Sequence, residues 1–417
     1  MPVESYNPRR RFLKSTAALA AVPYLLRFAA AHAADDVKVG FVLPLTGPFA
    51  EAGQLQKAAV DMAIEEINAA GGVKCLGGAK LVPLYGSYQT DAAEANVETE
   101  RLISKEKVVG IIGPYASGVA IAGTEIAERA KVPYLVPNAL SDAITSRGLK
   151  YTFKSVPHVS QFAIDGATVV QELSKAAKIE PKIACLVRAD DYFGNVVGEQ
   201  FRNHLPKFGF QISSDNTYPN NATSMEDVIL KLKGDDPDVV FAAGEPAAIT
   251  LLFQQLKELD YWPKLGWIGV GGGYSNPVTH KNLGDLANGL IVVNDWFPDI
   301  KRPGAKEANE RFKKRTGVDM LGNANTTYAG VWIFHAAIEK ACSADPTKIR
   351  DALASLHLTE GAPMFMYPEV AFDDKGFMKF ASNVAAQIQK GEAKVIWPKS
   401  LAVADATWPV AGWGKRK

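Results

Sequence analysis

The residues of this 417-residue chain best suited to binding a small anion surround Ser117. Ser117 follows the apolar, β-branched run 108–112 and begins a predicted helix that extends to Ala130. Its hydroxyl and the neighbouring backbone N–H groups would face outward at the positive end of the helix dipole, where negative charge is stabilised. Ser117 could also serve only as the helix N-cap, worth about 1 kcal/mol, and the two roles can coexist.

Three other residues, each close to the end of a predicted strand, could take part in binding. Tyr192 and Phe193 stand just before Gly194 at a strand-to-helix turn, where an aromatic ring could cover a ligand or pack in the core. Glu245 follows the apolar strand 239–242, at a strand end where ligand sites of α/β proteins gather. Its carboxylate could meet an ammonium group, or it could cap the helix that Pro246 begins.

The motifs of common enzyme classes are missing from the sequence. It contains no GxxxxGK[ST], HExxH or GxSxG, and the segment 269–274 fails the dinucleotide fingerprint because Tyr274 stands where the last glycine belongs. The histidines at 158, 204, 280, 335 and 357 lack the spacing of metal ligands. We therefore expect no catalytic residues, no cofactor and no metal.

Strands and helices alternate along most of the chain. The first series has strands at 37–44, 81–85, 108–112 and 132–136, and helices at 55–67, 92–104 and 117–130. The second has strands at 182–187, 211–218, 238–242 and 265–268, and helices at 194–205, 224–233 and 246–259. This alternation predicts an α/β fold of mainly parallel sheets with helices on both faces, and two series predict two lobes.

The chain is expected to cross between the lobes more than once. We place the first lobe at 34–156 plus about 292–383, and the second lobe at 157–291 plus about 384–417. The strand 290–293 and the helices 305–314 and 327–341 are interpreted as chain that returns to the first lobe. Several crossovers between two lobes would act as a hinge.

Residues 1–33 have the pattern of a twin-arginine signal peptide that is cleaved near Ala33. Three arginines at 9–11 precede an alanine-rich stretch that ends in Ala31-His32-Ala33. A membrane anchor is the alternative, but Pro23 and Arg27 interrupt the stretch before it reaches the ~20 apolar residues of a spanning helix. Removal takes five of 46 basic and one of 45 acidic residues, leaving 41 and 44. With no basic run, nucleic acid is not an expected partner.

The three cysteines, at 75, 185 and 342, show no CxxC spacing and cannot all pair within one chain. Cys185 lies inside the apolar run 182–187 and is expected to pack as a small hydrophobic residue. A bridge between Cys75 and Cys342 would suit an oxidising compartment, although the sequence does not supply the geometry it needs.

Several segments resemble the periplasmic leucine/isoleucine/valine-binding proteins, which are type I solute-binding proteins of ABC importers. The similar segments lie at 39–48, 112–117, 132–139, 191–194, 237–240 and 249–258, and the resemblance extends over 36–400. It implies a two-lobed periplasmic-binding-protein clamshell that closes on a branched-chain or other hydrophobic amino acid. It also implies a periplasmic monomer that passes its ligand to an inner-membrane ABC permease.

The resemblance also implies roles for individual residues. Ser117 and the backbone of Ala139 would hold the ligand's carboxylate, and Phe193 would cover the ligand from the second lobe. The full set of candidate ligand-binding residues is Tyr115, Ala116, Ser117, Asn138, Ala139, Leu140, Ser141, Tyr192, Phe193, Glu245, Gly271 and Tyr274.

Two departures from the family pattern leave the ligand open. Leu140 replaces a small hydroxylated residue, which leaves Ser141 to supply a hydroxyl, and the segment 269–274 has no carboxylate where the family holds the α-ammonium group. An unpaired buried ammonium costs several kcal/mol. Either Glu245 or another acid replaces the missing one, or the ligand is an aromatic or aliphatic carboxylic acid, for which the glycines and Tyr274 would widen the pocket. Use of the same clamshell as a ligand sensor is a further alternative.

Overall fold

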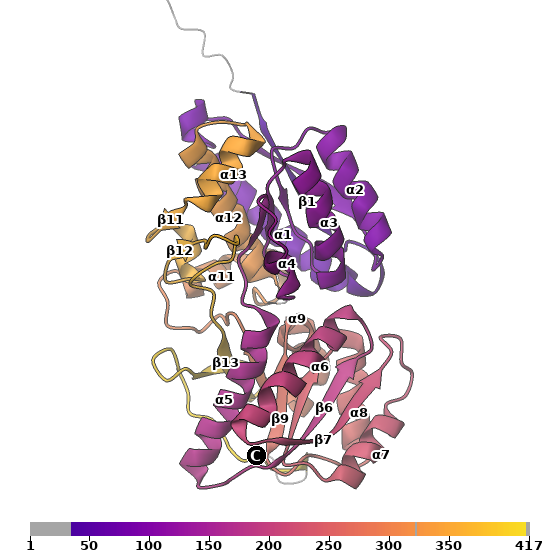
Figure 1. Cartoon of the computed structure of the whole chain (residues 1–417). Helices are drawn as coiled ribbons and strands as arrows, with labels where there is room; N and C mark the ends of the chain where they lie inside the picture. Colours follow the sequence, from indigo (N-terminus) through magenta and orange to yellow (C-terminus); the bar gives the residue numbers. More distant parts are fainter. Residues whose placement is uncertain (1–34, 322, 414–417) are drawn as a thin grey trace, which may run out of the picture.

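The alternating pattern folds into two lobes, each a sheet with helices on both faces (Figure 1). The computed structural model describes residues 35–321 and 323–413. The signal peptide predicted at 1–33 lies outside the described residues. The predicted fold class is confirmed by this architecture.

The first lobe contains a five-stranded, wholly parallel sheet in the order β2-β1-β3-β4-β5. Its strands are β1 (Val37–Leu43), β2 (Leu81–Ser87), β3 (Ile111–Ile112), β4 (Tyr134–Val136) and β5 (Thr152–Lys154). Its helices are α1 (Ala50–Ala69), α2 (Ala92–Ser104), α3 (Ser117–Ala130), α4 (Ala143–Ser146), α11 (Ala305–Thr316), α12 (Ala324–Ala341) and α13 (Pro346–Ala354).

The two faces of this sheet are covered by different parts of the chain. Side chains alternate between the faces of a strand, so Phe41 and Leu43 pack in the cluster with α1 and α12 while Val42 packs with α2 and α3. Helix α12, orange in Figure 1, therefore completes a lobe whose five-stranded sheet already ends at residue 154.

The second lobe contains a seven-stranded sheet in the order β14-β13-β10-β9-β8-β6-β7. Its strands are β6 (Ile183–Ala189), β7 (Gln211–Tyr218), β8 (Val239–Ala243), β9 (Gly266–Val270), β10 (Ile291–Asn294), β13 (Val384–Gln389) and β14 (Glu392–Trp397). Its helices are α5 (Val159–Ala177), α6 (Tyr192–His204), α7 (Glu226–Asp235), α8 (Pro246–Glu258), α9 (Gly272–Ser275) and α10 (Pro277–Leu283). Among the described strands of this sheet, only β13 runs opposite to the others, because it is antiparallel to both of its neighbours, β10 and β14.

The shorter elements join these parts. They are the 3-10 helices η1 (Gly47–Phe49), η2 (Lys74–Leu76), η3 (Leu205–Phe208), η4 (Gly284–Ala287) and η5 (Ala362–Phe365), and the two-stranded pair β11 (His357–Leu358) and β12 (Val370–Ala371). Within the described part of the chain, no helix combines the length and the hydrophobicity needed to cross a bilayer.

The placement of strand 290–293 in the first lobe was wrong. This strand is β10, which pairs in parallel with β9 and antiparallel with β13 in the sheet of the second lobe. All four residues of β10 are buried, as expected for a strand inside a sheet that is covered on both faces. The chain returns to the first lobe only after Asn294.

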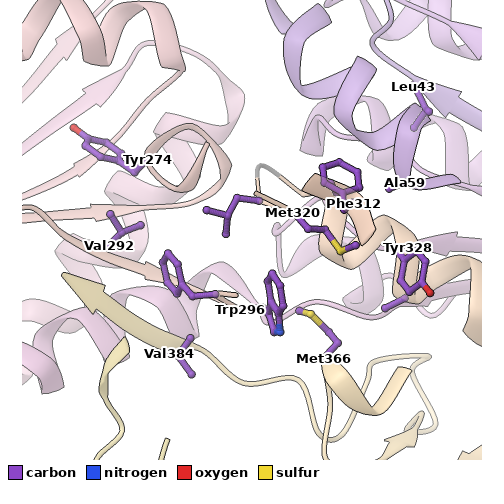
Figure 2. Close-up of a cluster of buried hydrophobic side chains, with 14 of the residues drawn as sticks. Leu43, Ala59, Tyr274, Val292, Trp296, Phe312, Met320, Tyr328, Met366 and Val384 are labelled. Atoms are coloured by element: carbon purple, nitrogen blue, oxygen red, sulfur yellow. The ribbon is translucent and has the colours of Figure 1, made fainter. Parts of the chain in front are cut away.

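Three segments cross between the lobes, after β5, after β10 and before β13. Beside them lies an apolar cluster to which both lobes contribute. Figure 2 shows Trp296, from the second crossover, near Met366 and Met320, with Val292 on the side of the second lobe and Tyr328 on the side of the first. The crossovers and this cluster together form the hinge region.

A disulfide joins Cys75 to Cys342, with 5.4 Å between their Cα atoms. It links the segment after α1 to the residue that ends α12, two helices that pack against each other. Cys185 is free and buried in β6. The bridge that the sequence left open is therefore formed in this structure.

Replacing Cys342 with serine should lower the free energy of unfolding by about 2–4 kcal/mol, because the bridge closes a long loop and so restricts the unfolded chain. Urea unfolding of the oxidised wild type and of C342S measures the difference. Dithiothreitol should destabilise the wild type and leave C342S unchanged. Equal midpoints for the two oxidised proteins would contradict the expectation.

Candidate functional site

A cavity of about 550 Å³ lies between the two lobes, at the carboxyl ends of their parallel strands. Ligand sites of open α/β sheets form at this edge. The described lining residues are Pro48, Phe49, Thr90, Ala92, Tyr115, Ala116, Ser117, Gly118, Val119, Asn138, Leu140, Asp190, Asp191, Tyr192, Phe193, Pro219, Asn220, Asn221, Glu245, Gly272, Asn294, Asp295 and Asn323.

The structure brings eight of the twelve candidate residues to this cavity. They are Tyr115, Ala116, Ser117, Asn138, Leu140, Tyr192, Phe193 and Glu245. The other four do not line it: Ala139 packs in the core of the first lobe, Ser141 lies behind Ser117, and Gly271 and Tyr274 lie under the wall of the second lobe.

The N-terminus of α3 points its free backbone donors at the cavity. Ser117 is the first residue of the helix, Ala116 is its N-cap, and the first N–H bonded within the helix is that of Ala120. The N–H groups of Ser117, Gly118 and Val119 precede that bond, and all three residues line the cavity. This end of the helix can therefore hold an anionic group.

The side chain of Ser117 does not cap its own helix, so the N-cap alternative was wrong. Its Oγ accepts a hydrogen bond from the backbone N–H of Ser141 at 3.4 Å. That leaves the hydroxyl hydrogen available to the cavity. The segment that leads into α3 is fixed by Tyr88, whose hydroxyl accepts the N–H groups of Tyr115 and Ala116 at 3.2 Å each.

Glu245 faces this helix end from the second lobe. It occupies the N-cap position of α8, but its carboxylate makes no cap hydrogen bond and lines the cavity instead. Its Oε2 accepts a hydrogen bond from the Tyr115 hydroxyl at 3.0 Å, which joins the two lobes directly. Burial, reinforced by the nearby charge of Asp191, raises the pKa of Glu245 from 4.5 to about 8.

Asp295 is a second buried carboxyl group at the cavity, and it was missing from the candidate set. It follows β10, and its Oδ1 accepts from the side chains of Asn294 at 3.2 Å and Asn325 at 3.1 Å. Burial raises its pKa from 3.8 to about 7. Its position directly after a buried strand is the same signal that marked Glu245, but the strand had been assigned to the other lobe.

Of the segment after β9, Gly272 lines the cavity but Gly271, Gly273 and Tyr274 are not among the lining residues, so the expectation that these glycines and Tyr274 widen the pocket was wrong. A Cβ on Gly273 would lie 1.9 Å from the carbonyl oxygen of Gly244, and one on Gly272 would lie 2.8 Å from Asn323 Oδ1. Glycine is therefore required where backbone segments approach each other. Tyr274 is fully buried, and its hydroxyl accepts the Trp267 indole N–H at 3.1 Å.

Aromatic and aliphatic side chains from both lobes complete the walls. Phe49 and Tyr115 lie with ring centroids 5.5 Å apart. Phe193 forms part of the opposite wall, where a Cβ on Gly271 would approach its ring to 2.9 Å. Tyr192 reaches across to α3 of the first lobe, near Gly118. Phe49 ends the short 3-10 helix η1, and Asn220 and Asn221 lie in the turn after β7; none of the three belongs to a recognisable motif, so the sequence did not point to them.

Two further contacts hold the first-lobe wall in place. The Asn138 amide lies 2.6 Å from the hydroxyl oxygen of Thr326 at the start of α12. The carbonyl of Leu140 accepts a hydrogen bond from the fully buried ammonium of Lys154 at 2.8 Å, and Lys154 also donates to the carbonyl of Pro157 in the first crossover at 3.0 Å. The cavity wall is thus tied to the hinge region.

Comparison with known proteins relates this arrangement to proteins that bind solutes. The profile of the family described as "Periplasmic binding protein" matches residues 36–392. Leu/Ile/Val-binding protein homolog 7 of Brucella suis biovar 1 (strain 1330) is 31% identical over 397 residues, which cover 91% of this chain and 96% of the relative.

Two solved structures share the fold. The branched-chain amino acid substrate-binding protein LivJ of Streptococcus pneumoniae, in complex with isoleucine, has a TM-score of 0.76 at 21% identity and covers 87% of this chain and 100% of its own. A solute-binding protein of Rhodopseudomonas palustris BisB5, in complex with 3,4-dihydroxybenzoic acid, has a TM-score of 0.75 at 21% identity and covers 86% and 95%.

Proposed function

Because this chain belongs to the periplasmic binding protein family, which confirms the resemblance seen in the sequence, we propose that it is the extracytoplasmic solute-binding subunit of an ABC importer. It captures a small amino acid in the periplasm, as a monomer, and presents it to an inner-membrane ABC permease. The branched-chain class comes from the names of its relatives. Its role is binding rather than catalysis.

One observation carries the proposal: the helix end that can hold a carboxylate and the carboxylate that can hold an ammonium lie on opposite lobes of one cavity. Ser117 and the N–H groups after it bind the ligand's carboxylate, Glu245 receives its ammonium group, and Phe193 and Tyr192 cover it. A ligand that touches both lobes binds the closed form better than an open one, so it shifts the population towards closure.

The aromatic-acid alternative is less well supported. A protein of similar fold holds 3,4-dihydroxybenzoic acid. In this chain, a ligand whose only charge is a carboxylate would form no charge pair with Glu245, because burial raises the pKa of Glu245 to about 8 and keeps it protonated near neutral pH. An amino acid satisfies both ends of the cavity.

Replacing Ser117 with alanine should weaken binding of the captured amino acid by about tenfold or more, since a hydrogen bond to a charged group is lost. A thermal-shift screen of amino acids and aromatic acids identifies the ligand, because a solute that binds only the folded protein raises its melting temperature. Calorimetry then compares S117A with the wild type.

The matched control is Ser104→Ala, which removes an exposed hydroxyl of the same lobe at the end of α2. It should leave the affinity within about twofold of the wild type. A change under about twofold for S117A as well would reject the ligand role of Ser117. Failure of every amino acid and every carboxylic acid to bind would reject the proposed function itself.

A further inference from the structure

The charges that line the cavity are all of one sign. Of the described residues in its lining, four are acidic, Asp190, Asp191, Glu245 and Asp295, and none is lysine, arginine or histidine. A cavity with this lining attracts positive charge and repels negative charge.

Two of the four acids are already satisfied by the protein or by water. Asp191 is the N-cap of α6: its Oδ1 accepts the N–H of Gly194 at 2.7 Å, and its Oδ2 accepts the amide of Asn220 at 2.8 Å. Asp190 is exposed at the rim of the cavity. Neither residue requires a cation from the ligand.

The other two acids, Glu245 and Asp295, are at least nine-tenths buried, at 9% and 5% exposure. Each has one oxygen that accepts hydrogen bonds and one that, among the described residues, accepts none from another side chain: Oε1 of Glu245 and Oδ2 of Asp295. A buried carboxylate is stable only when it is paired or protonated. These two oxygens are therefore open positions for a charged ligand group.

Among the described residues, no cation forms an ion pair with either acid. The titratable groups that face Glu245 are the hydroxyls of Tyr115, Tyr88 and Tyr218 and the carboxylate of Asp191. Those that face Asp295 are the hydroxyl of Tyr367 and the guanidinium of Arg302. Arg302 forms no ion pair with Asp295 within the described residues and donates instead to the carbonyl of Met366.

We propose that the ligand carries two positively charged groups, one for each of the two buried carboxylates, in addition to the carboxylate held at the N-terminus of α3. This inference rests on the proposed function and narrows it to an amino acid with a cationic side chain, such as lysine, ornithine or arginine. The α-ammonium group takes Glu245, and the side-chain cation takes Asp295.

The walls of the cavity suit such a side chain. Val119, Leu140 and Phe193 contribute apolar side chains to the cavity lining. The methylene stem of a lysine or arginine covers apolar surface while its head group stays charged. A hydrophobic amino acid and a basic amino acid would therefore contact the same apolar lining. Only the basic one would also pair with Asp295.

The test is calorimetry on the exported chain with four probes: L-lysine, L-arginine, L-leucine and benzoate. We expect lysine or arginine to bind at least about tenfold more tightly than leucine, and benzoate to bind most weakly. Asp295→Asn should weaken binding of the basic amino acid by about 30-fold or more and change that of leucine by less than about threefold. Glu245→Gln should weaken both.

The matched control is Glu199→Gln, which removes one exposed acidic charge of α6 in the same lobe, outside the cavity lining. It should change every affinity by less than about twofold. The melting temperature and circular dichroism of each variant show that it is folded.

A second measurement needs no variant. Because burial raises the pKa of Glu245 to about 8 and that of Asp295 to about 7, binding of two cations must expel protons from both groups. The affinity for arginine should therefore rise by about tenfold or more between about pH 6 and about pH 8, with protons released to the buffer.

The outcomes separate the inference from the function it rests on. Leucine binding as tightly as the basic amino acids, or an Asp295→Asn variant that binds them normally, would overturn the inference and leave the proposed function standing. An affinity for arginine that does not change with pH would overturn the inference and also the assignment of the ammonium group to Glu245. Binding of benzoate alone would overturn the inference and replace the amino acid by a carboxylic acid. Binding of none of the four probes would count against both.

Discussion

Glu245→Gln should stabilise the ligand-free protein above about pH 8, by about 3–5 kcal/mol relative to the wild type. The pKa of Glu245 is 4.5 in the unfolded chain and about 8 in the folded one, so between these values the folded state holds more protons. The stability of the folded wild type is therefore highest below pH 4.5 and is lost progressively as the pH rises through about 8. Glutamine has no charge to bury, and it can still accept the hydrogen bond from Tyr115.

The measurement is the free energy of unfolding of both proteins in urea across about pH 4 to about pH 9. The difference between them should be near zero at the acidic end and grow with pH, which removes the effect of every group common to both proteins. Glu199→Gln, at an exposed position, should show no such growth. If the free energies of unfolding of E245Q and the wild type differed by the same amount at every pH, the pKa of Glu245 would not be raised by folding.

Trp296→Ala should lower the free energy of unfolding by about 3–5 kcal/mol, the usual cost of removing a large buried aromatic side chain. Trp296 is fully buried in the apolar cluster of the hinge region (Figure 2). Its ring lies 5.4 Å from that of Phe365, and its indole N–H donates to the Phe365 carbonyl at 3.1 Å. Both contacts join the second crossover to η5, which precedes the third crossover in the chain.

Trp296→Phe is the matched control, because it keeps most of the buried surface and loses the hydrogen bond and part of the volume. It should cost about 1–2 kcal/mol. Urea unfolding of the three proteins in the oxidised state measures both differences. A loss of less than about 1 kcal/mol for W296A would contradict the prediction and would mean that the neighbouring side chains fill the space left by the indole ring.

Much of the fold could be predicted from the sequence because the signal was local. Apolar strands and amphipathic helices alternate clearly enough to indicate two lobes, and the strand-to-helix turns located Ser117, Phe193 and Glu245. Long-range pairing was harder. The residues 291–294 predict a buried strand, but their pattern does not distinguish pairing with β9 from pairing in the first sheet. Because the strand was assigned to the first lobe, Asp295 was not recognised as a cavity residue.

Contacts between segments that are distant in sequence were the second feature that the sequence did not predict. Glycines in a row suggest open space, but Gly273 is packed against the carbonyl of Gly244, a contact between segments that are not adjacent in sequence. Tyr274 was placed in the cavity for the same reason, and it lies in the core beside Trp267. The spacing of residues along the chain indicates local structure, but it does not indicate which distant backbone segments pack against each other.

The late arrival of α12 has a consequence for how the protein is made. The five strands of the first sheet are complete by residue 154, but α12, which covers part of one face together with α1, begins at residue 324. On the ribosome, that apolar face stays exposed while most of the second lobe, from α5 to β10, is translated. A nascent chain in this state is prone to aggregation, so a chaperone that shields hydrophobic surface should be needed until α12 docks.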